Sequence, residues 1–235
     1  MKTAYQSIAG VPALVIGEAS ERAWLFVHGK LGCKEEALAF GELACPMGWQ
    51  VVGVDLPEHG SRREEPTPLV PWTAAPEIAR VMADARGRWA HVGLIAVSIG
   101  AYMSLRALWQ TPPDCALFVS PILDMDRLIT TMMGWAGVSQ EELERRGEIP
   151  TAFGETLSAA YQRDVRSHPV ERWDAPTAIL YAGGDHLTPR GVVDAFAAAH
   201  GARATVMEEG EHWFHTPEQM AVLRTWLDAE MERLG

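Results

Sequence analysis

Ser98 is the residue whose type and surroundings point most directly to chemistry. It ends the apolar run Val92–Val97, which is typical of a strand buried on both faces. Small residues, Ala96 and Gly100, lie two positions before and after it. They allow a sharp turn from strand to helix, which projects the serine hydroxyl above the sheet and aims the N–H of Ile99 at a developing oxyanion. The pattern predicts a nucleophilic serine.

A base and an acid for such a serine follow later in the chain. Two histidines, His212 and His215, lie between the predicted strand Ala204–Met207 and a helix that begins at Thr216-Pro217. Asp185 follows another predicted strand and two glycines. A histidine can remove the hydroxyl proton, and a buried carboxylate can fix the tautomer of that histidine. Together the three residue types predict acyl-transfer chemistry.

Several segments resemble motifs of the α/β-hydrolase superfamily, and the resemblance extends from about Trp24 to the C-terminus. The segment around Ser98 resembles the G-x-S-x-G turn of that superfamily, with Ala96 at the first glycine. Two other similar segments are an oxyanion loop in FVHGKLG at 26–32 and an acid-bearing loop in GGDHLTP at 183–189. A third, VDLPEHGS at 54–61, is similar to a D-x-P-G-H-G-x-S stretch, with Glu58 in place of the usual glycine. The order serine, acid, histidine is also the order of the superfamily.

The resemblance implies a role for each reacting group. Ser98 is expected to be the nucleophile, His212 the general base and Asp185 the acid that orients the histidine. The backbone N–H groups of Lys30 and Ile99 are expected to form the oxyanion hole. No metal ion and no organic cofactor are implied.

Two assignments keep an alternative. The N–H of Leu31 is the neighbouring possibility for the oxyanion-hole donor at Lys30. Asp124 competes with Asp185 because some members of the superfamily carry the acid after the preceding strand. We interpret Asp124 as a hinge residue of an insertion instead. His215 lies beside a predicted helix N-cap, so it is a weaker candidate for the general base than His212.

Three polar residues before the nucleophile are expected to shape loops. His28 should hold the oxyanion loop through hydrogen bonds, and Asp55 and His59 should form the loop after the next strand. Acids and bases of the catalytic triad follow the nucleophile in this superfamily, so these residues are not expected to react.

Short apolar runs alternate with helical periodicity over most of the chain, which predicts an α/β fold. The expected architecture is an α/β-hydrolase fold with a mostly parallel central sheet, helices on both faces and a small helical cap insertion. The predicted strands are Ala13–Ile16, Ala23–Val27, Gln50–Val54, Val92–Val97, Ala116–Val119, Thr177–Tyr181 and Ala204–Met207. Helices are predicted at Lys34–Cys45, around Ile78–Trp89, at Ala101–Trp109 and after Thr188-Pro189 and Thr216-Pro217, where a threonine N-cap precedes a proline.

The alternation stops between Asp124 and Asp174, so residues 1–235 are expected to form one hydrolase domain with a cap insertion at about 124–174. Apolar side chains in this insertion either pack the cap or line a substrate pocket together with residues beside the reacting groups. The residues predicted for that pocket are Leu31, Met125, Ile129, Met132, Trp213 and Phe214.

Composition excludes several classes of partner. The formal net charge of −11 and the pI near 5.2 argue against a phosphate-binding surface, so no nucleic-acid partner is expected. No segment has the roughly 18 apolar residues of a membrane helix, and a cytoplasmic protein without a membrane partner is expected. The three cysteines lack metal-ligand or disulfide-framework spacing. The oligomeric state is not predicted.

The expected reaction is the hydrolysis of a small-molecule carboxylic ester, with a small to medium or aromatic acyl group, through an acyl-serine intermediate. Thioesters and amides are alternatives because fold and triad do not separate them. A binding module that keeps the scaffold without turnover is the alternative from another class. The intact set of three residues argues against that alternative.

Overall fold

The computed structural model describes residues 1–234 and divides the chain into two compact units. The first unit comprises residues 1–123 and the segment that begins at Arg172, and the second comprises Asp124–Glu171. In the described residues no helix combines the length and the apolar composition needed to cross a bilayer.

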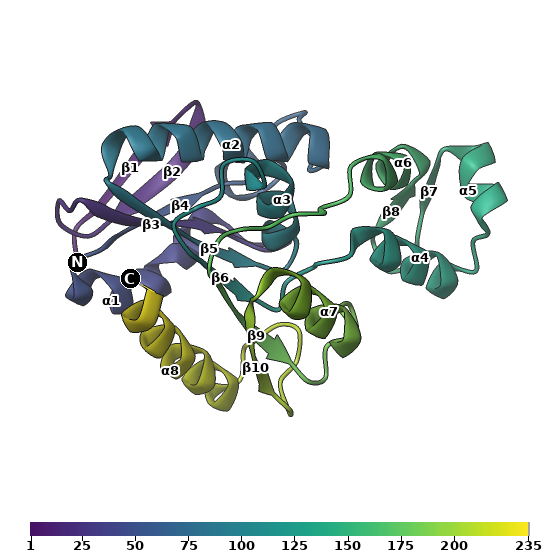
Figure 1. Cartoon of the computed structure of the whole chain (residues 1–235). Helices are drawn as coiled ribbons and strands as arrows, with labels where there is room; N and C mark the ends of the chain where they lie inside the picture. The colour runs from purple at the N-terminus through teal and green to yellow at the C-terminus, as the bar shows by residue number, and fades with distance from the viewer. Residues whose placement is uncertain (235) are drawn as a thin grey trace. The chain divides into compact units, whose positions relative to one another are not determined.

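An eight-stranded sheet forms the first unit, in the order β1-β2-β4-β3-β5-β6-β9-β10 (Figure 1). Its strands are β1 (Thr3–Ile8), β2 (Val11–Ile16), β3 (Arg22–Val27), β4 (Gln50–Val54), β5 (His91–Val97), β6 (Ala116–Val119), β9 (Thr177–Ala182) and β10 (Arg203–Met207). β2 pairs antiparallel with β1 and β4, and all other neighbours are parallel. The carboxyl ends of β3, β5, β6, β9 and β10 therefore meet at one edge of the sheet, where ligands bind in open α/β sheets.

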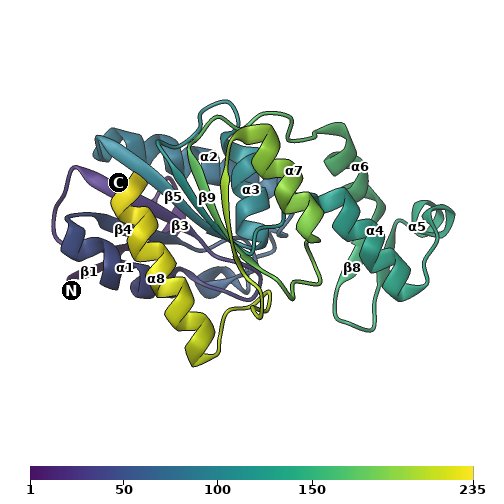
Figure 2. The same ribbon diagram turned by 60° about the horizontal axis from the view of Figure 1, so that its bottom comes forward.

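Helices cover both faces of this sheet. They are α1 (Ala37–Ala44), α2 (Pro71–Arg88), α3 (Ile99–Leu108), α7 (Arg190–His200) and α8 (Pro217–Leu234), with 3₁₀ turns at Lys34–Glu36, Cys45–Met47 and Gly60–Arg62. Figures 1 and 2 show α1 and α8 on one face and α2 and α3 on the other. Trp24 and Phe26 lie two residues apart on β3 and belong to the buried cluster that also contains Phe40 of α1 and Trp226 of α8. Because successive side chains of a strand point to opposite faces, Trp24 and Phe26 share the face that α1 and α8 cover.

The second unit consists of short elements. They are α4 (Met125–Ala136), α5 (Gln140–Arg146), β7 (Glu148–Pro150), β8 (Thr156–Ser158) and α6 (Ala159–Ser167). α4 and α5 end at Gly137 and Gly147, whose φ angles of 65° and 77° favour glycine over residues with a Cβ. The side chains of Asp124 and Ser139 accept hydrogen bonds at the starts of the same two helices. Glycines and caps explain why this segment breaks into pieces.

The predicted strands are present, and the mostly parallel sheet with helices on both faces is confirmed. β1 was not predicted because residues Thr3–Ser7 are exposed and lack apolar alternation. The helix predicted over Lys34–Cys45 is shorter than predicted, since α1 covers Ala37–Ala44 between two 3₁₀ turns. The chain packs closely there: a Cβ on Gly53 of β4 would lie 2.3 Å from the Lys34 carbonyl oxygen.

The two late helices start differently. Thr216 caps α8 as predicted, because its Oγ1 accepts a hydrogen bond of 3.3 Å from the Gln219 N–H and Pro217 is the first helical residue. The prediction that Thr188 caps α7 is wrong. The N-cap of α7 is Pro189, and the Thr188 hydroxyl donates instead to the Pro121 carbonyl oxygen at 2.9 Å.

Candidate active site

Ser98 lies at a strained turn between β5 and α3. Its φ and ψ angles are 50° and −120°, a region that residues with a Cβ rarely occupy and that costs about 1–3 kcal/mol. The Ser98 N–H donates to the Val119 carbonyl oxygen at 3.0 Å, and the Ser98 carbonyl oxygen accepts from the N–H groups of Ala101 and Ile122, each at 3.1 Å. The neighbouring strand and helix therefore hold the turn in place.

The residues two positions from Ser98 are small for a visible reason. A Cβ on Gly100 would lie 2.4 Å from the His28 carbonyl oxygen and 2.6 Å from that of Val27. α3 can therefore approach β3 only with glycine at this position. Ala96 is fully buried in β5, paired with Val27 and Phe118, so the methyl group at this position is accommodated.

Three side chains form a continuous hydrogen-bonded series. The Ser98 Oγ lies 2.8 Å from the His212 Nε2, and the His212 Nδ1 lies 2.7 Å from the Asp185 Oδ2. The carboxylate side chain of Asp185 is fully buried and the imidazole of His212 is 14% exposed. An Nδ1–H that donates to the carboxylate leaves the His212 Nε2 as the acceptor for the serine hydroxyl.

The other carboxylate oxygen of Asp185 is also satisfied. Its Oδ1 accepts hydrogen bonds from the N–H groups of Leu187 at 2.7 Å and Thr188 at 3.1 Å. These two donors orient the carboxylate plane and compensate for its burial. No sequence signal could have identified these two donors, because every residue except proline has a backbone N–H group.

Close packing of two loops brings the acid and the histidine together. A Cβ on Gly183 would lie 2.3 Å from the Glu208 carbonyl oxygen, so the acid loop touches the loop after β10. The Gly184 N–H donates to the Gly210 carbonyl oxygen at 2.9 Å. The glycines before Asp185 thus allow the contact that positions Asp185 beside His212.

The alternative acid and the alternative base have other partners. The Asp124 Oδ1 accepts the Arg127 N–H at 3.0 Å and caps α4. The His215 Nδ1 lies 2.7 Å from the Trp213 carbonyl oxygen, and its ring stacks on that of Trp213 at 4.6 Å between centroids. The side chains of Asp185 and His212, not those of Asp124 and His215, therefore connect to Ser98.

His28 holds the predicted oxyanion loop. Its ring is fully buried, the Nδ1–H donates to the Gly29 carbonyl oxygen at 2.7 Å, and the Nε2 accepts from the Leu56 N–H at 3.0 Å. Burial lowers the pKa of His28 to about 4, so the ring stays neutral. The expectation of a structural role agrees with these contacts.

The predicted oxyanion loop passes directly beside Ser98. A Cβ on Gly29 would lie 3.3 Å from the Ser98 Cβ, which places the following residue, Lys30, next to the site. Leu31 has a φ of 65° and its side chain is 85% exposed. Ile99, the other predicted oxyanion-hole residue, is the first residue of α3. The N-terminus of a helix favours negative charge, which suits this position.

A buried ion pair shapes the loop that carries Leu56. The Asp55 Oδ2 lies 2.7 Å from the Lys34 Nζ and accepts from the Ser61 hydroxyl at 2.8 Å. Burial favours the neutral carboxyl group, but hydrogen bonds from Lys34 and Ser61 outweigh it and hold the pKa of Asp55 below its usual value. His59 is buried and its Nδ1 lies 2.7 Å from the Pro57 carbonyl oxygen. Asp55 and His59 thus form the loop, as predicted.

Not all predicted pocket residues lie at the site. Phe214 is wrong as a pocket residue, because it is 7% exposed and packs in the core cluster against α8. Trp213, by contrast, is 73% exposed and directly follows His212. Leu31 lies in the predicted oxyanion loop and is exposed. The other three predicted residues lie on α4 of the second unit, where Met125 and Ile129 are buried and Met132 is half-buried.

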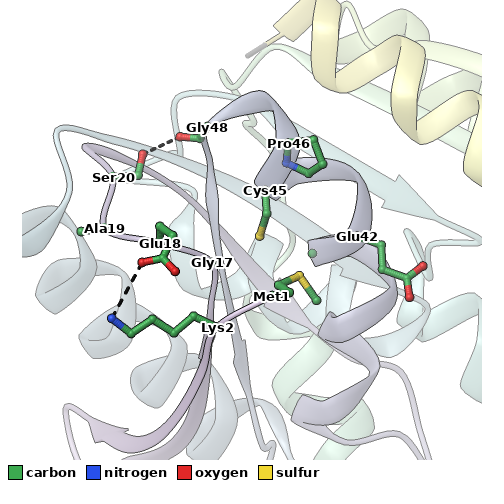
Figure 3. A pocket seen from close by; sticks show the side chains of 11 residues that line it. Met1, Lys2, Gly17, Glu18, Ala19, Ser20, Glu42, Cys45, Pro46 and Gly48 are labelled. Atoms are coloured by element: carbon green, nitrogen blue, oxygen red, sulfur yellow. Dashed lines mark hydrogen bonds and ion pairs between the residues drawn. The ribbon is translucent and has the colours of Figure 1, made fainter.

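A cavity of about 400 Å³ lies elsewhere in the first unit, among Gly17, Gly41 and Cys45 (Figure 3). It adjoins the starts of β3 and β4, at the edge of the sheet opposite Ser98. Burial raises the pKa of the Cys45 thiol, which makes it a poor nucleophile. Within the described residues no group of three or more His, Cys, Asp and Glu side chains could hold a metal ion.

The sheet order, the strained serine and the histidine loop together define the α/β-hydrolase fold, and comparison with solved structures shows the same fold. Mouse α/β hydrolase domain-containing protein 10 is similar over 100% of both chains, with a TM-score of 0.80 and 14% identity. Est1E from Butyrivibrio proteoclasticus, solved with ferulic acid bound, is similar over 98% of both chains, with a TM-score of 0.78 and 16% identity.

An esterase from Pyrococcus furiosus also shares the fold, with a TM-score of 0.66 and 16% identity over 99% of this chain and 88% of the esterase. No protein-family model and no curated protein matches the sequence. At these identities the similarity establishes the fold, and the activity must be argued from the site itself.

Proposed function

We propose that this protein is a serine hydrolase that cleaves carboxylic esters through an acyl-serine intermediate. The observation that carries the proposal is the series Ser98–His212–Asp185, with heavy-atom distances of 2.8 Å and 2.7 Å. His212 takes the proton from Ser98 as the Oγ attacks the ester carbonyl carbon. Asp185 stabilises the imidazolium that forms. The carbonyl oxygen becomes an oxyanion, which the N–H groups of Lys30 and Ile99 bind.

The tetrahedral intermediate then collapses. The bond to the leaving alkoxide breaks, His212 returns the proton to that oxygen, and the acyl group stays on Ser98. His212 next removes a proton from water, whose oxygen attacks the acyl carbon. The second collapse releases the carboxylic acid and restores the Ser98 hydroxyl. Every proton is thus carried by His212.

Two observations support a small to medium or aromatic acyl group. Leu31 follows the oxyanion-hole residue Lys30 and Trp213 follows the base His212, and both side chains are largely exposed, at 85% and 73%. Exposed apolar side chains beside a reactive centre are available to bind an apolar substrate group. Est1E, which shares the fold, was solved with ferulic acid, an aromatic carboxylic acid.

The decisive experiment combines covalent labelling and turnover. Wild-type protein should react with a fluorophosphonate at Ser98 and hydrolyse p-nitrophenyl butyrate. Ser98→Ala should abolish labelling and lower turnover about a thousandfold or more. Ser104→Ala is the matched control, since Ser104 lies buried in α3 and its Oγ has no hydrogen-bond partner among the described residues. Undiminished labelling and turnover in Ser98→Ala would refute the proposal.

The class of acyl compound is tested separately. A matched set of butyryl ester, thioester and anilide should show the highest kcat/KM for the ester. A higher kcat/KM for the thioester or the anilide would still support the triad, but it would indicate that the protein is a thioesterase or an amidase. No labelling of correctly folded wild-type protein would favour the non-catalytic binding module.

A further inference from the structure

The loop that carries His212 is held by few contacts of its own backbone. On its N-terminal side the Gly210 N–H donates to the Met207 carbonyl oxygen at 2.9 Å. Beyond Gly210, residues 211–215 make no backbone–backbone hydrogen bond within the described part of the chain. The position of the His212 ring must therefore depend on side chains that fix this loop.

One anchor is apolar and the other is a buried amide. Phe214 packs into the core beneath α8. Gln219, in the first turn of α8, is only 4% exposed. Its Oε1 accepts the His215 N–H at 3.0 Å, and its Nε2 donates to the Glu211 Oε2 at 3.4 Å. The Gln219 amide thus binds the loop on both sides of His212.

The hydrogen bonds of Gln219 differ from those of an ordinary helix cap. In a capping box the side chain at this position accepts the N–H of the N-cap residue, which here is Thr216. Gln219 instead accepts the N–H of His215, one residue earlier, and reaches Glu211 before the histidine. A role limited to starting α8 would require neither contact.

We infer that Gln219 is a positioning residue that acts through the 211–215 loop to keep the His212 imidazole between Asp185 and Ser98. The inference rests on the proposed function. Proton transfer requires the serine and imidazole to stay within hydrogen-bond reach, and a misplacement of about 1 Å can lower the rate on the order of a hundredfold. Gln219 holds this geometry from α8, whose apolar side packs in the core through Trp226 and Leu227.

Three variants test the inference. Gln219→Met keeps the side-chain volume and removes both hydrogen bonds, so kcat should fall on the order of tenfold with KM changed less than about twofold. Gln219→Glu keeps the acceptor for His215 but places a second carboxylate beside Glu211, and kcat should also fall. The double variant Glu211→Gln with Gln219→Glu exchanges donor and acceptor and should restore most of the kcat. A merely structural role does not predict this rescue.

A matched control measures the cost of losing a half-buried, hydrogen-bonded amide elsewhere. Gln50 accepts from the Trp89 Nε1 at 2.8 Å and donates to the Gly17 carbonyl oxygen at 3.4 Å, at the opposite edge of the sheet. Gln50→Met should lower the melting temperature and leave kcat unchanged.

Wild-type kcat in Gln219→Met, or a folded double variant without recovery of kcat, would overturn the inference. If Gln219→Met does not fold, the kcat values of Gln219→Glu and of the double variant test the inference. Full activity of Ser98→Ala would instead refute the proposed function, so the two failures are distinct.

Discussion

The carbonyl oxygen of His28 faces the α-carbon of Gly100 so closely that a Cβ there would lie only 2.4 Å away. This contact joins the predicted oxyanion loop to the first turn of the helix after Ser98. This one packing contact therefore sets the position of the strained Ser98 relative to the expected oxyanion donors. The contact is possible only because residue 100 is glycine.

Gly100→Ala should destabilise the protein by about 3 kcal/mol, because the new methyl group must displace the backbone of β3 or α3. It should also lower kcat, since the oxyanion loop moves away from Ser98. Gly87→Ala is the matched control: Gly87 lies in α2 with no atom within 4 Å of the added Cβ. That substitution should stabilise the protein by about 0.5–1 kcal/mol. Urea unfolding of both variants checks the prediction, and equal stabilities would contradict it.

Asp185→Asn should lower kcat on the order of a thousandfold or more, because the amide does not hold the Nδ1–H tautomer of His212. Asp124→Asn should change activity less than about twofold, since asparagine caps helices as well as aspartate does. Kinetics with p-nitrophenyl butyrate compare the two variants directly. The reverse order would assign the acid to Asp124.

Stability should fall in acid because of His28. Its pKa is lowered from 6.5 to about 4 in the folded protein, so the unfolded chain binds the proton first as the pH falls. The stabilising contribution is present in full above pH 6.5 and is lost as the pH falls to about 4. It amounts to about 3 kcal/mol.

Two measurements check this dependence. The ring protons of His28 should titrate in NMR spectra only near pH 4, and a midpoint near 6.5 would contradict the prediction. Urea unfolding between pH 7 and 4.5 should show a smaller loss of stability for His28→Gln than for wild type, because the neutral amide binds no proton.

Acyl specificity should depend on the two exposed apolar residues beside the site. Each buried methylene contributes up to about 0.8 kcal/mol, so p-nitrophenyl butyrate should exceed the acetate about tenfold in kcat/KM. Leu31→Ala and Trp213→Ala should reduce this preference, and Trp213→Ala should also weaken a cinnamoyl ester. The check is a series of p-nitrophenyl esters from acetate to decanoate. A steady decline from acetate upward, identical in both variants, would exclude Leu31 and Trp213 from acyl binding.

Local sequence patterns were sufficient for much of the architecture. The apolar run before Ser98 and the small residues beside it determine a buried strand and a sharp turn, because both depend on neighbouring residues only. The glycines before Asp185 likewise mark a close approach of two loops. β1 was missed because five of its six side chains are exposed, so its formation depends on pairing with β2 rather than on an apolar pattern.

The sequence by itself determined which residue types could react and their order along the chain. The sequence already favoured His212 over His215 and Asp185 over Asp124. Only the tertiary structure, however, showed which side chains connect to Ser98, since Ser98 and His212 are 114 residues apart and no local pattern records their distance. It connected His212 rather than His215 to Ser98 and assigned Asp124 to a helix cap. It also showed that Phe214 lies in the core and that the Gln219 side chain binds the loop that carries His212. Hydrophobic periodicity specifies that a side chain is buried, but the partner of that side chain is decided by how distant segments pack.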